Sequence, residues 1–430
     1  MILLEPGAIA LIMIAIFFFA ILIRIPVAFA LVMSVLPFML LDSRFNLELL
    51  VQRMYAGIDS FVLLAVPFFI FAASLMTLTG VTDRLFDFAR SIVGGARGGL
   101  GVVNVASSIG FSGMSGSSTA DVSGAGSILI PQMIKRGYSR EYCAAVTASS
   151  AVISSIIPPS IQLIVWGSLT NTSIGRLFLG AIIPGLLVGV ALMFVAWIVA
   201  VRAGYPPEAR FNWGVFWKTF VGALPAFGII AIVFIGFRFG VVTATEAAVT
   251  AVIYAMLVAA LMYRSLTLKN LLQSLATTAS LTGVALLALA AASVIGYLLA
   301  IYNIPSMFGS LLSDIPGWAV LAVIVMIFLF IGCFLDPLPA MAIMIPVFAP
   351  FVLAAGIDPV QYGVVAIMTL AVGLVTPPVG ICLLIASQIA EVNLIRVIKP
   401  ALPFLFAILF IIALCVTFPQ LVLWLPSLGA

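Results

Sequence analysis

Prolines recur at a fixed spacing of 219 residues along this chain, and the repeated prolines fall inside apolar segments. The matching pairs are Pro6 with Pro225, Pro131 with Pro350, Pro158 and Pro159 with Pro377 and Pro378, Pro184 with Pro403, and Pro207 with Pro426. Chance would give about one such match. The spacing therefore indicates a tandem duplication, with a first repeat in residues 1–212 and a second repeat in residues 219–430.

The composition restricts both repeats to a membrane. Of the 430 residues, 64% are apolar and only 7% are charged, whereas a soluble domain has about 25% charged residues. Several apolar runs reach the length of about 20 residues that crosses a bilayer, including 7–23, 60–80, 178–201 and 397–419. We therefore expect an all-α polytopic membrane protein in a lipid bilayer, and the net charge of +4 does not indicate a nucleic-acid partner.

Each repeat predicts the same order of elements. In the first repeat we expect helical segments at 7–23, 26–41, 60–80, 83–96, 99–135, 139–168 and 176–201, with a loop at 42–59, and the second repeat follows by adding 219. The centre of residues 99–135 reads GMSGSSTAD at 113–121, which is too polar to cross a bilayer unprotected. A re-entrant helical hairpin at about 99–135 fits better, and its counterpart at about 320–350 breaks at residues 332–337.

The arginines and lysines predict how the repeats lie in the membrane. If each hairpin makes no net crossing, each repeat has five crossings, and the second repeat is inserted upside down. Only Arg44, Arg53, Arg176 and Arg238 then lie on one side, while the other fourteen of the 18 basic residues lie on the opposite, cytoplasmic side. This topology places both termini in the periplasm, the first hairpin on the cytoplasmic side and the second on the periplasmic side.

Four interruptions of helical structure meet by symmetry: the two hairpin tips and the Pro-Pro sequences within residues 154–160 and 373–380. Proline in mid-helix frees backbone carbonyls, and carbonyls together with hydroxyls suit Na⁺, a hard cation. The oxygen-bearing or adjacent candidates are Ser112, Gly113, Ser115, Ser117, Ser118, Thr119, Ser154, Ser155, Pro158, Ser160, Gly332, Asp336, Gly373, Val375 and Thr376. Helix starts at Ser118–Asp121 and Asp336–Pro337 would also present free N–H groups to a carboxylate.

Structural explanations compete with a binding site. Glycines near the first tip also permit close helix packing, and Pro-Pro also produces simple kinks. Thr243 and Glu246 have the spacing of a capping box, which favours a structural role for that carboxylate. Asp121 and Asp336 either bind a ligand or cap a helix. Proton coupling through Asp121, Asp336 or Glu246 remains open but is less favoured than sodium, because hydroxyls and carbonyls outnumber carboxylates at the interruptions.

Missing residue types exclude several activities. The chain contains no histidine, which removes a Ser-His pair, a histidine metal cluster and a histidine proton relay. It contains no Walker sequence, so ATP bound by this chain cannot supply energy. These observations predict a protein that is not an enzyme and that draws its energy from an ion gradient or a partner.

The chain resembles the large membrane subunit of tripartite ATP-independent periplasmic (TRAP) transporters, of the dicarboxylate and sialic acid type. The resemblance rests on GMSGSSTAD at 113–121, IIPPS at 156–160, GVVTATEAA at 240–248, FLDP at 334–337 and VTPPVG at 375–380. It implies a secondary transporter of a bacterial inner membrane that works with a separate small four-helix membrane subunit and a soluble periplasmic substrate-binding protein. It also implies sodium coupling and an elevator mechanism.

The resemblance leads to a specific assignment. A transport domain of about residues 60–168 and 279–390 would move against a scaffold built from the remaining helices. One sodium would bind the first hairpin tip with residues 154–158, and a second would bind the other tip with residues 373–376. The substrate, an organic acid anion such as sialic acid or a C4-dicarboxylate, would lie against Ser115, Ser117, Ser160 and Thr376. The alternative is a stand-alone sodium- or proton-coupled carboxylate transporter that needs no binding protein.

Overall fold

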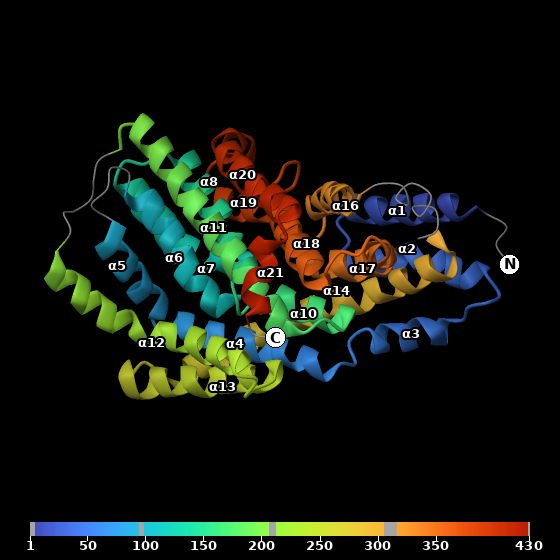
Figure 1. The fold of residues 1–430 in the computed structure, drawn as a ribbon, viewed down its shortest axis with the longest axis horizontal. Helices are drawn as coiled ribbons and strands as arrows, with labels where there is room; N and C mark the ends of the chain where they lie inside the picture. The colour runs from blue at the N-terminus through green and yellow to red at the C-terminus, as the bar shows by residue number, and fades with distance from the viewer. Residues whose placement is uncertain (1–4, 94–98, 206–211, 305–315, 429–430) are drawn as a thin grey trace.

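The computed structural model describes residues 5–93, 99–205, 212–304 and 316–428. Pro207 of the proline repeat, the arginines at 97 and 210, and the end of the expected segment 83–96 lie outside these ranges. Within them the chain forms helices and connecting turns, without strands. Figure 1 shows an elongated bundle, with the first helices of the chain at one end and α5 and the start of α12 at the other.

The first repeat follows the expected order closely. Its helices are α1 (Pro6–Leu22), α2 (Val27–Leu41), α3 (Leu47–Ala56), the short helix η1 (Phe61–Leu64), α4 (Ala65–Leu78), α5 (Val81–Val93), α6 (Gly99–Ser115), α7 (Ser118–Lys135), α8 (Arg140–Ala151), α9 (Ile153–Ile156), α10 (Ile161–Thr170) and α11 (Ile174–Arg202). The expected hairpin at 99–135 is therefore the pair α6 and α7, and the expected segment 139–168 is α8 to α10.

In the second repeat most described elements lie at about the same spacing, although α12 begins earlier than the expected residue 226 and the expected segment 302–315 lies mostly outside the described residues. Its described helices are α12 (Trp213–Arg238), α13 (Ala244–Leu257), η2 (Val258–Met262), α14 (Leu268–Ile301), α16 (Gly317–Gly332), α17 (Pro337–Ala354), α18 (Pro359–Gly373), α19 (Ile381–Ile389), α20 (Leu394–Thr417) and α21 (Gln420–Ser427). The second hairpin, α16 and α17, ends at Ala354, which is 219 residues after the end of the first hairpin.

The helices have the length and composition of membrane spans. Seven described helices are long and apolar enough to cross a bilayer, or eight if the bent pair around the first Pro-Pro sequence counts as one span. Together with the charged share of 7%, this confirms an all-α polytopic membrane protein. The opposite insertion of the two repeats and the periplasmic position of the termini stay predictions.

The two repeats differ between their second and fourth helical segments. The expected loop at 42–59 is wrong, because residues Leu47–Ala56 form α3. In the second repeat the equivalents of α3 and α4 merge into α14, a single helix of 34 residues. The exchange at one position favours this difference, because Gly57 disfavours helix in the first repeat and Ala276 replaces it in the second.

Two predicted helix caps form, and a third helix start is not capped as expected. Thr243 and Glu246 form the capping box, with the Thr243 amide 2.7 Å from Glu246 Oε2. Asp336 caps α17 by accepting from the Leu338 amide at 3.3 Å. The start of α7 is different: its N-cap is Ser117, whose side chain makes no capping bond, and Asp121 is directed to α9 instead.

The broken helices of both repeats pack together at the centre of the bundle. In the first repeat α9 contacts α18 and α10 contacts α17, while α19 contacts α7 and α8. Two ion pairs join the repeats at the ends of these helices, Arg140 with Glu391 at 2.9 Å and Arg176 with Asp358 at 3.6 Å. All four cysteines are buried and free, as expected for packing residues. This packing places the helices that flank both Pro-Pro sequences at the contact between the repeats.

Candidate functional site

The first Pro-Pro sequence interrupts the helical segment that α8, α9 and α10 form. The Pro158–Pro159 peptide bond is cis, and the axis bends by 41° across the interruption. Ser160 stabilises the bend, because its hydroxyl donates to the Ser155 carbonyl at 2.6 Å and accepts from the Leu163 amide at 3.4 Å. We call residues Ser154 to Ser160 the first break.

The tip of the first hairpin contacts the first break through its backbone. Between α6 and α7 the chain turns at Gly116, whose φ of 59° favours glycine. The Ile161 amide donates to the Gly116 carbonyl at 3.3 Å. A Cβ atom at Gly116 would lie 2.6 Å from the Pro159 carbonyl oxygen, so the approach requires glycine. The tip and the break therefore form one rigid unit.

Polar side chains of the hairpin meet those of the first break beside this contact. The Ser154 hydroxyl donates to Asp121 Oδ2 at 2.8 Å, and the hydroxyls of Ser118 and Ser155 are 2.5 Å apart. All four side chains are buried, with at most 1% of each residue exposed. One predicted sodium ligand from the hairpin, Ser118, and two from the break, Ser154 and Ser155, are thus brought together around the Asp121 carboxylate.

A buried polar network extends from this cluster along α6 and α8. Ser108 interacts with Asp121 and donates to Ser150 at 3.0 Å. Ser150 donates to the side-chain carbonyl of Asn104 at 3.0 Å, and Asn104 donates to Thr147 at 2.7 Å. These residues are not among those predicted from the sequence. The spacing of four residues between Asn104 and Ser108 could have indicated them, because it places two polar side chains on the same face of an apolar helix.

The Asp121 carboxylate lies in an unusual electrostatic environment. Its hydrogen-bond partners are hydroxyl groups, and no lysine or arginine in the described ranges forms an ion pair with it. A buried carboxylate is costly unless a cation pairs with it or a proton neutralises it. The cluster is therefore suited to hold a small cation or a proton.

The second Pro-Pro sequence lies between α18 and α19 and shares the cis peptide bond of the first but has different side chains. The Pro377–Pro378 peptide bond is cis, and Gly380 has a φ of 54°. The Thr376 hydroxyl donates to the Val372 carbonyl of its own helix at 2.8 Å. We call residues Gly373 to Gly380 the second break.

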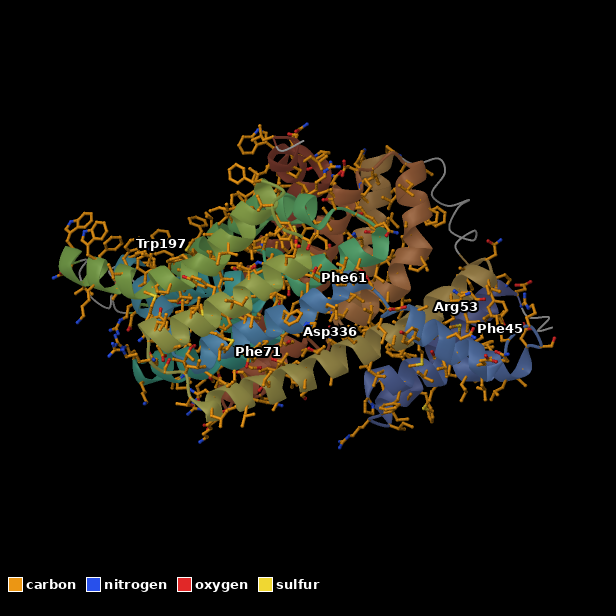
Figure 2. The ribbon with its side chains drawn as sticks, turned by 90° about the horizontal axis from the view of Figure 1, so that it is seen from below. Phe45, Arg53, Phe61, Phe71, Trp197 and Asp336 are labelled. Carbon is orange, nitrogen blue, oxygen red and sulfur yellow. The ribbon has the colours of Figure 1, made fainter. Side chains whose placement is uncertain are left out.

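The second hairpin approaches the second break through two glycines. A Cβ atom at Gly373 would lie 2.3 Å from the Gly332 carbonyl carbon, so the two backbones are in direct contact. Asp336 caps α17 from the turn of this hairpin and is half-buried. Figure 2 shows Asp336 in the middle part of the molecule, away from Phe45 and Arg53 at one end and Trp197 at the other. α19, which follows the second break, packs against α7, the helix that carries Asp121.

Other predicted site residues have local partners. The Ser112 hydroxyl donates to the Ile109 carbonyl at 2.6 Å, and the Ser117 and Thr119 hydroxyls are 3.1 Å apart. The Ser115 hydroxyl is buried and has no hydrogen-bond partner in the described part of the chain. Gly113 faces Ile230 of α12, whose Cδ1 would lie 2.2 Å from an added Cβ atom.

Predicted substrate residues divide between the two breaks. Ser115, Ser117 and Ser160 lie around the first hairpin tip, whereas Thr376 belongs to the second break. Among the described residues no hydrogen bond joins Thr376 to these three serines. Pro158 lines an apolar cavity of about 450 Å³ behind the first break, and Val375 is buried in the turn after α18.

The ligand chemistry of the site favours a hard monovalent cation. In the described ranges no group of three histidine, cysteine, aspartate or glutamate side chains could hold a metal ion. The available ligands are hydroxyls, backbone carbonyls freed at the prolines and the Asp121 carboxylate. This set, with an unpartnered buried hydroxyl at Ser115, fits Na⁺ better than a transition metal.

Known proteins share this architecture and sequence. A family model described as "Tripartite ATP-independent periplasmic transporter, DctM component" matches residues 14–421. The sialic acid TRAP transporter large permease protein SiaM of Vibrio cholerae is 36% identical over 406 residues, covering 94% of this chain and 95% of that protein. The C4-dicarboxylate TRAP transporter large permease protein DctM of the same organism is 32% identical over 428 residues, covering 94% of each.

A solved structure has a similar fold at low sequence identity. The YdaH transporter of Alcanivorax borkumensis, whose crystal structure is described as having an unusual topology, superimposes with a TM-score of 0.63. It is 14% identical, and the match covers 91% of each chain. This similarity supports the fold and says nothing of the transported molecule.

Proposed function

The chain belongs to the DctM component family of tripartite ATP-independent periplasmic transporters, and from that premise we propose that it is the large membrane subunit of a sodium-coupled importer of an organic acid anion. Its partners are a small four-helix membrane subunit and a periplasmic substrate-binding protein, which delivers the anion. The protein lies in the bacterial inner membrane with both termini in the periplasm.

Asp121 carries the proposal of sodium coupling. Its carboxylate is buried, contacts Ser154, and lies next to the paired hydroxyls of Ser118 and Ser155. Sodium would neutralise the carboxylate and take hydroxyl and carbonyl oxygens as further ligands. The second break would hold a second sodium through carbonyl oxygens of residues 373–376 with Gly332 and Asp336.

The substrate would lie between the two hairpin tips. Ser117 and Thr119 are half-buried there and carry hydroxyl donors, while Ser115, Ser160 and Thr376 are the further candidates. Sialic acid and C4-dicarboxylates, the molecules named for the two relatives, both carry carboxylates that hydroxyls and helix N-termini can bind. Because these two anions differ in size but share carboxylates, we propose that the binding protein, and not this chain, selects the anion.

Uptake into proteoliposomes tests the function directly. The chain and its small membrane subunit are reconstituted, and labelled sialic acid or C4-dicarboxylate is offered with each candidate binding protein, in sodium or in potassium. The proposal predicts uptake that requires both sodium and a binding protein. Uptake without any binding protein would support the stand-alone carrier instead, and equal uptake in potassium would refute sodium coupling.

An elevator mechanism requires the first hairpin to slide against the scaffold. Gly113 of α6 and Ile230 of α12 lie on the two sides of that boundary, and the Ile230 Cβ atom is 3.6 Å from the position of a Cβ atom at Gly113. This spacing lies in the range of about 3.5–4.5 Å that disulfides need. A Gly113→Cys and Ile230→Cys double variant should therefore cross-link under oxidation.

Uptake by the cross-linked protein distinguishes a hairpin that slides against α12 from one that stays fixed to it during transport. We expect oxidation to stop uptake by the double variant and reduction to restore it, whereas Ile230→Cys alone should keep its activity under oxidation. The native cysteines are buried and free, which limits competing disulfides. Full uptake by the cross-linked protein would show that α6 does not move against α12.

A further inference from the structure

A polar cavity lies between α5 and α12, away from both breaks. Its volume is about 580 Å³, and Arg84, Asp87, Arg90 and Lys218 line it together with Ser91 and Thr219. The Thr219 hydroxyl donates to the Ser91 hydroxyl at 3.0 Å and joins the two helices at the cavity wall. Three cationic side chains and one carboxylate give the cavity a net positive charge, which suits an anionic ligand.

The cations differ in how firmly they are placed. Arg84 is held by two contacts: its Nη1 donates to the Gly80 carbonyl at 3.0 Å, and its guanidinium lies 3.6 Å from the centre of the Tyr263 ring. Asp87 interacts with Arg90 on the same helix. Lys218 is exposed and forms no ion pair with any described residue. Lys218 therefore has an ammonium group available to a ligand.

The surroundings of the cavity are those of a membrane interface. α12 begins at Trp213 and is apolar enough to span a bilayer from that end. Trp213 and Trp217 are 66% and 56% exposed beside Lys218, and tryptophans of this kind lie at the level of lipid headgroups. On α5 the polar side chains Arg84, Asp87 and Ser91 line the polar cavity, while Leu85 and Ile92 line a neighbouring apolar cavity.

The apolar cavity lies farther along α12 than the polar cavity, whereas on α5 the residues that line the two cavities alternate along the helix. The apolar cavity measures about 450 Å³ and is lined on α12 by Phe227, Ile230 and Val233, and on α5 by Phe88 and Ile92. Lys218 and Ile230 are separated by about 18 Å along the helix axis, at a rise of 1.5 Å per residue. This distance is close to the depth of one hydrocarbon leaflet, about 15 Å.

We infer that an anionic phospholipid binds between α5 and α12, with its phosphate in the polar cavity and an acyl chain directed toward the apolar cavity. The positive charge at one end and the apolar walls at the other match the two parts of one lipid molecule. The apolar cavity is also lined by Ile157 and Pro158 of the first break and by Gly110 of α6. The lipid would therefore fill the space where α12 faces the first hairpin and the first break.

Native mass spectrometry of the purified chain tests this inference without any transport measurement. The protein is offered an equimolar mixture of phosphatidylglycerol and phosphatidylcholine in detergent. We expect one phosphatidylglycerol to be retained in preference to phosphatidylcholine. In Lys218→Gln this retention should weaken about fivefold, the equivalent of about 1 kcal/mol for one basic side chain near an anionic lipid.

Lys269→Gln is the matched control, because Lys269 is an exposed lysine at the start of α14, outside the cavity. It should retain phosphatidylglycerol like the unaltered protein. Equal retention of the two lipids, equal loss in both variants, or displacement of the lipid by millimolar inorganic phosphate would each overturn the inference. The last result would indicate a site for a soluble anion.

Discussion

The two breaks share a cis Pro-Pro peptide bond but differ in chemistry and exposure. In the first break Pro159 and Ser160 are buried, and hydroxyls surround the Asp121 carboxylate. In the second break Pro378 and Val379 are exposed, and glycines bring two backbones together. At a spacing of 219 residues, Gly373, Leu374 and Val379 replace Ser154, Ser155 and Ser160, and Ala340 replaces Asp121.

This difference shows what the duplication preserved and what it left free. Both breaks keep the cis proline bond and a close approach by a hairpin glycine, Gly116 in one and Gly332 in the other. The proposed oxygen ligands differ: hydroxyls around the Asp121 carboxylate in the first site, and backbone carbonyls with Asp336 in the second. We expect the first site, which has more side-chain oxygens, to depend more strongly on single side chains.

The largest effect should follow the loss of the carboxylate. Asp121→Asn keeps the size of the side chain but removes its charge, and a hydrogen bond to a charged group contributes about 1.5–3 kcal/mol. We therefore expect uptake at low sodium to fall by up to about a hundredfold. Asp83→Asn, at an exposed aspartate of α5, should leave uptake unchanged. Normal sodium-dependent uptake by Asp121→Asn would remove the proposed role of the first break.

Glycine replacement should have the next largest effect and acts on stability. In Gly373→Ala the new Cβ atom meets the Gly332 backbone, and overpacking of this kind costs about 1–3 kcal/mol. Thermal unfolding in detergent should shift to lower temperature. Gly283→Ala is the control, because no atom lies within 4 Å of its added Cβ atom. Equal unfolding temperatures for the two variants would contradict a required contact between backbones.

Removal of single hydroxyl groups tests how much each break contributes to sodium affinity. Ser155→Ala leaves the buried Ser118 hydroxyl without its partner, whereas the Thr376 hydroxyl bonds only to its own helix. We expect the sodium concentration for half-maximal uptake to rise about tenfold in Ser155→Ala, since an unpaired buried hydroxyl costs about 1–3 kcal/mol. Thr376→Ala should change it less. Ser127→Ala, at an exposed serine of α7, is the control. A larger effect of Thr376→Ala would reverse the ranking of the two sites.

Labelling of single introduced cysteines compares the solvent exposure of the two breaks, and we expect the smallest effect from it. In this structure Val379 is 37% exposed and Ser160 is buried. A maleimide should therefore label Val379→Cys rapidly and Ser160→Cys slowly, over a low background because the native cysteines are buried. Similar labelling rates at both positions would show that the two breaks are equally accessible in solution.

Sequence predicted the elements of the fold better than the contacts of the site. Apolar runs and proline positions placed α1, α2 and the first hairpin within two residues of their ends, because membrane helices need long apolar stretches. The sequence did not predict α3, a short amphipathic helix with Glu48 and Arg53 that lies within the loop expected at 42–59. Arg53 packs on Tyr297, 3.8 Å from its ring centre, and this partner lies in the other repeat.

Long-range contacts explain the rest of the difference. Asp121 looked like part of a helix start, but the structure pairs it with Ser154, 33 residues away. The network through Asn104, Ser108 and Ser150 likewise depends on how α6 packs against α8. The direct contact of Gly332 with Gly373 needs both backbones in place. Such pairings depend on three-dimensional packing, which spacing along one chain does not define.

Sodium binding to the purified protein tests the central claim most directly. Thermal unfolding is followed while sodium or potassium is added at constant ionic strength, in the unaltered protein and in Asp121→Asn. A cation that binds only the folded state raises the unfolding temperature. We expect sodium but not potassium to raise the unfolding temperature, and we expect this rise to be clearly smaller in Asp121→Asn. Equal stabilisation by the two ions, or a sodium effect unchanged in Asp121→Asn, would contradict the central claim.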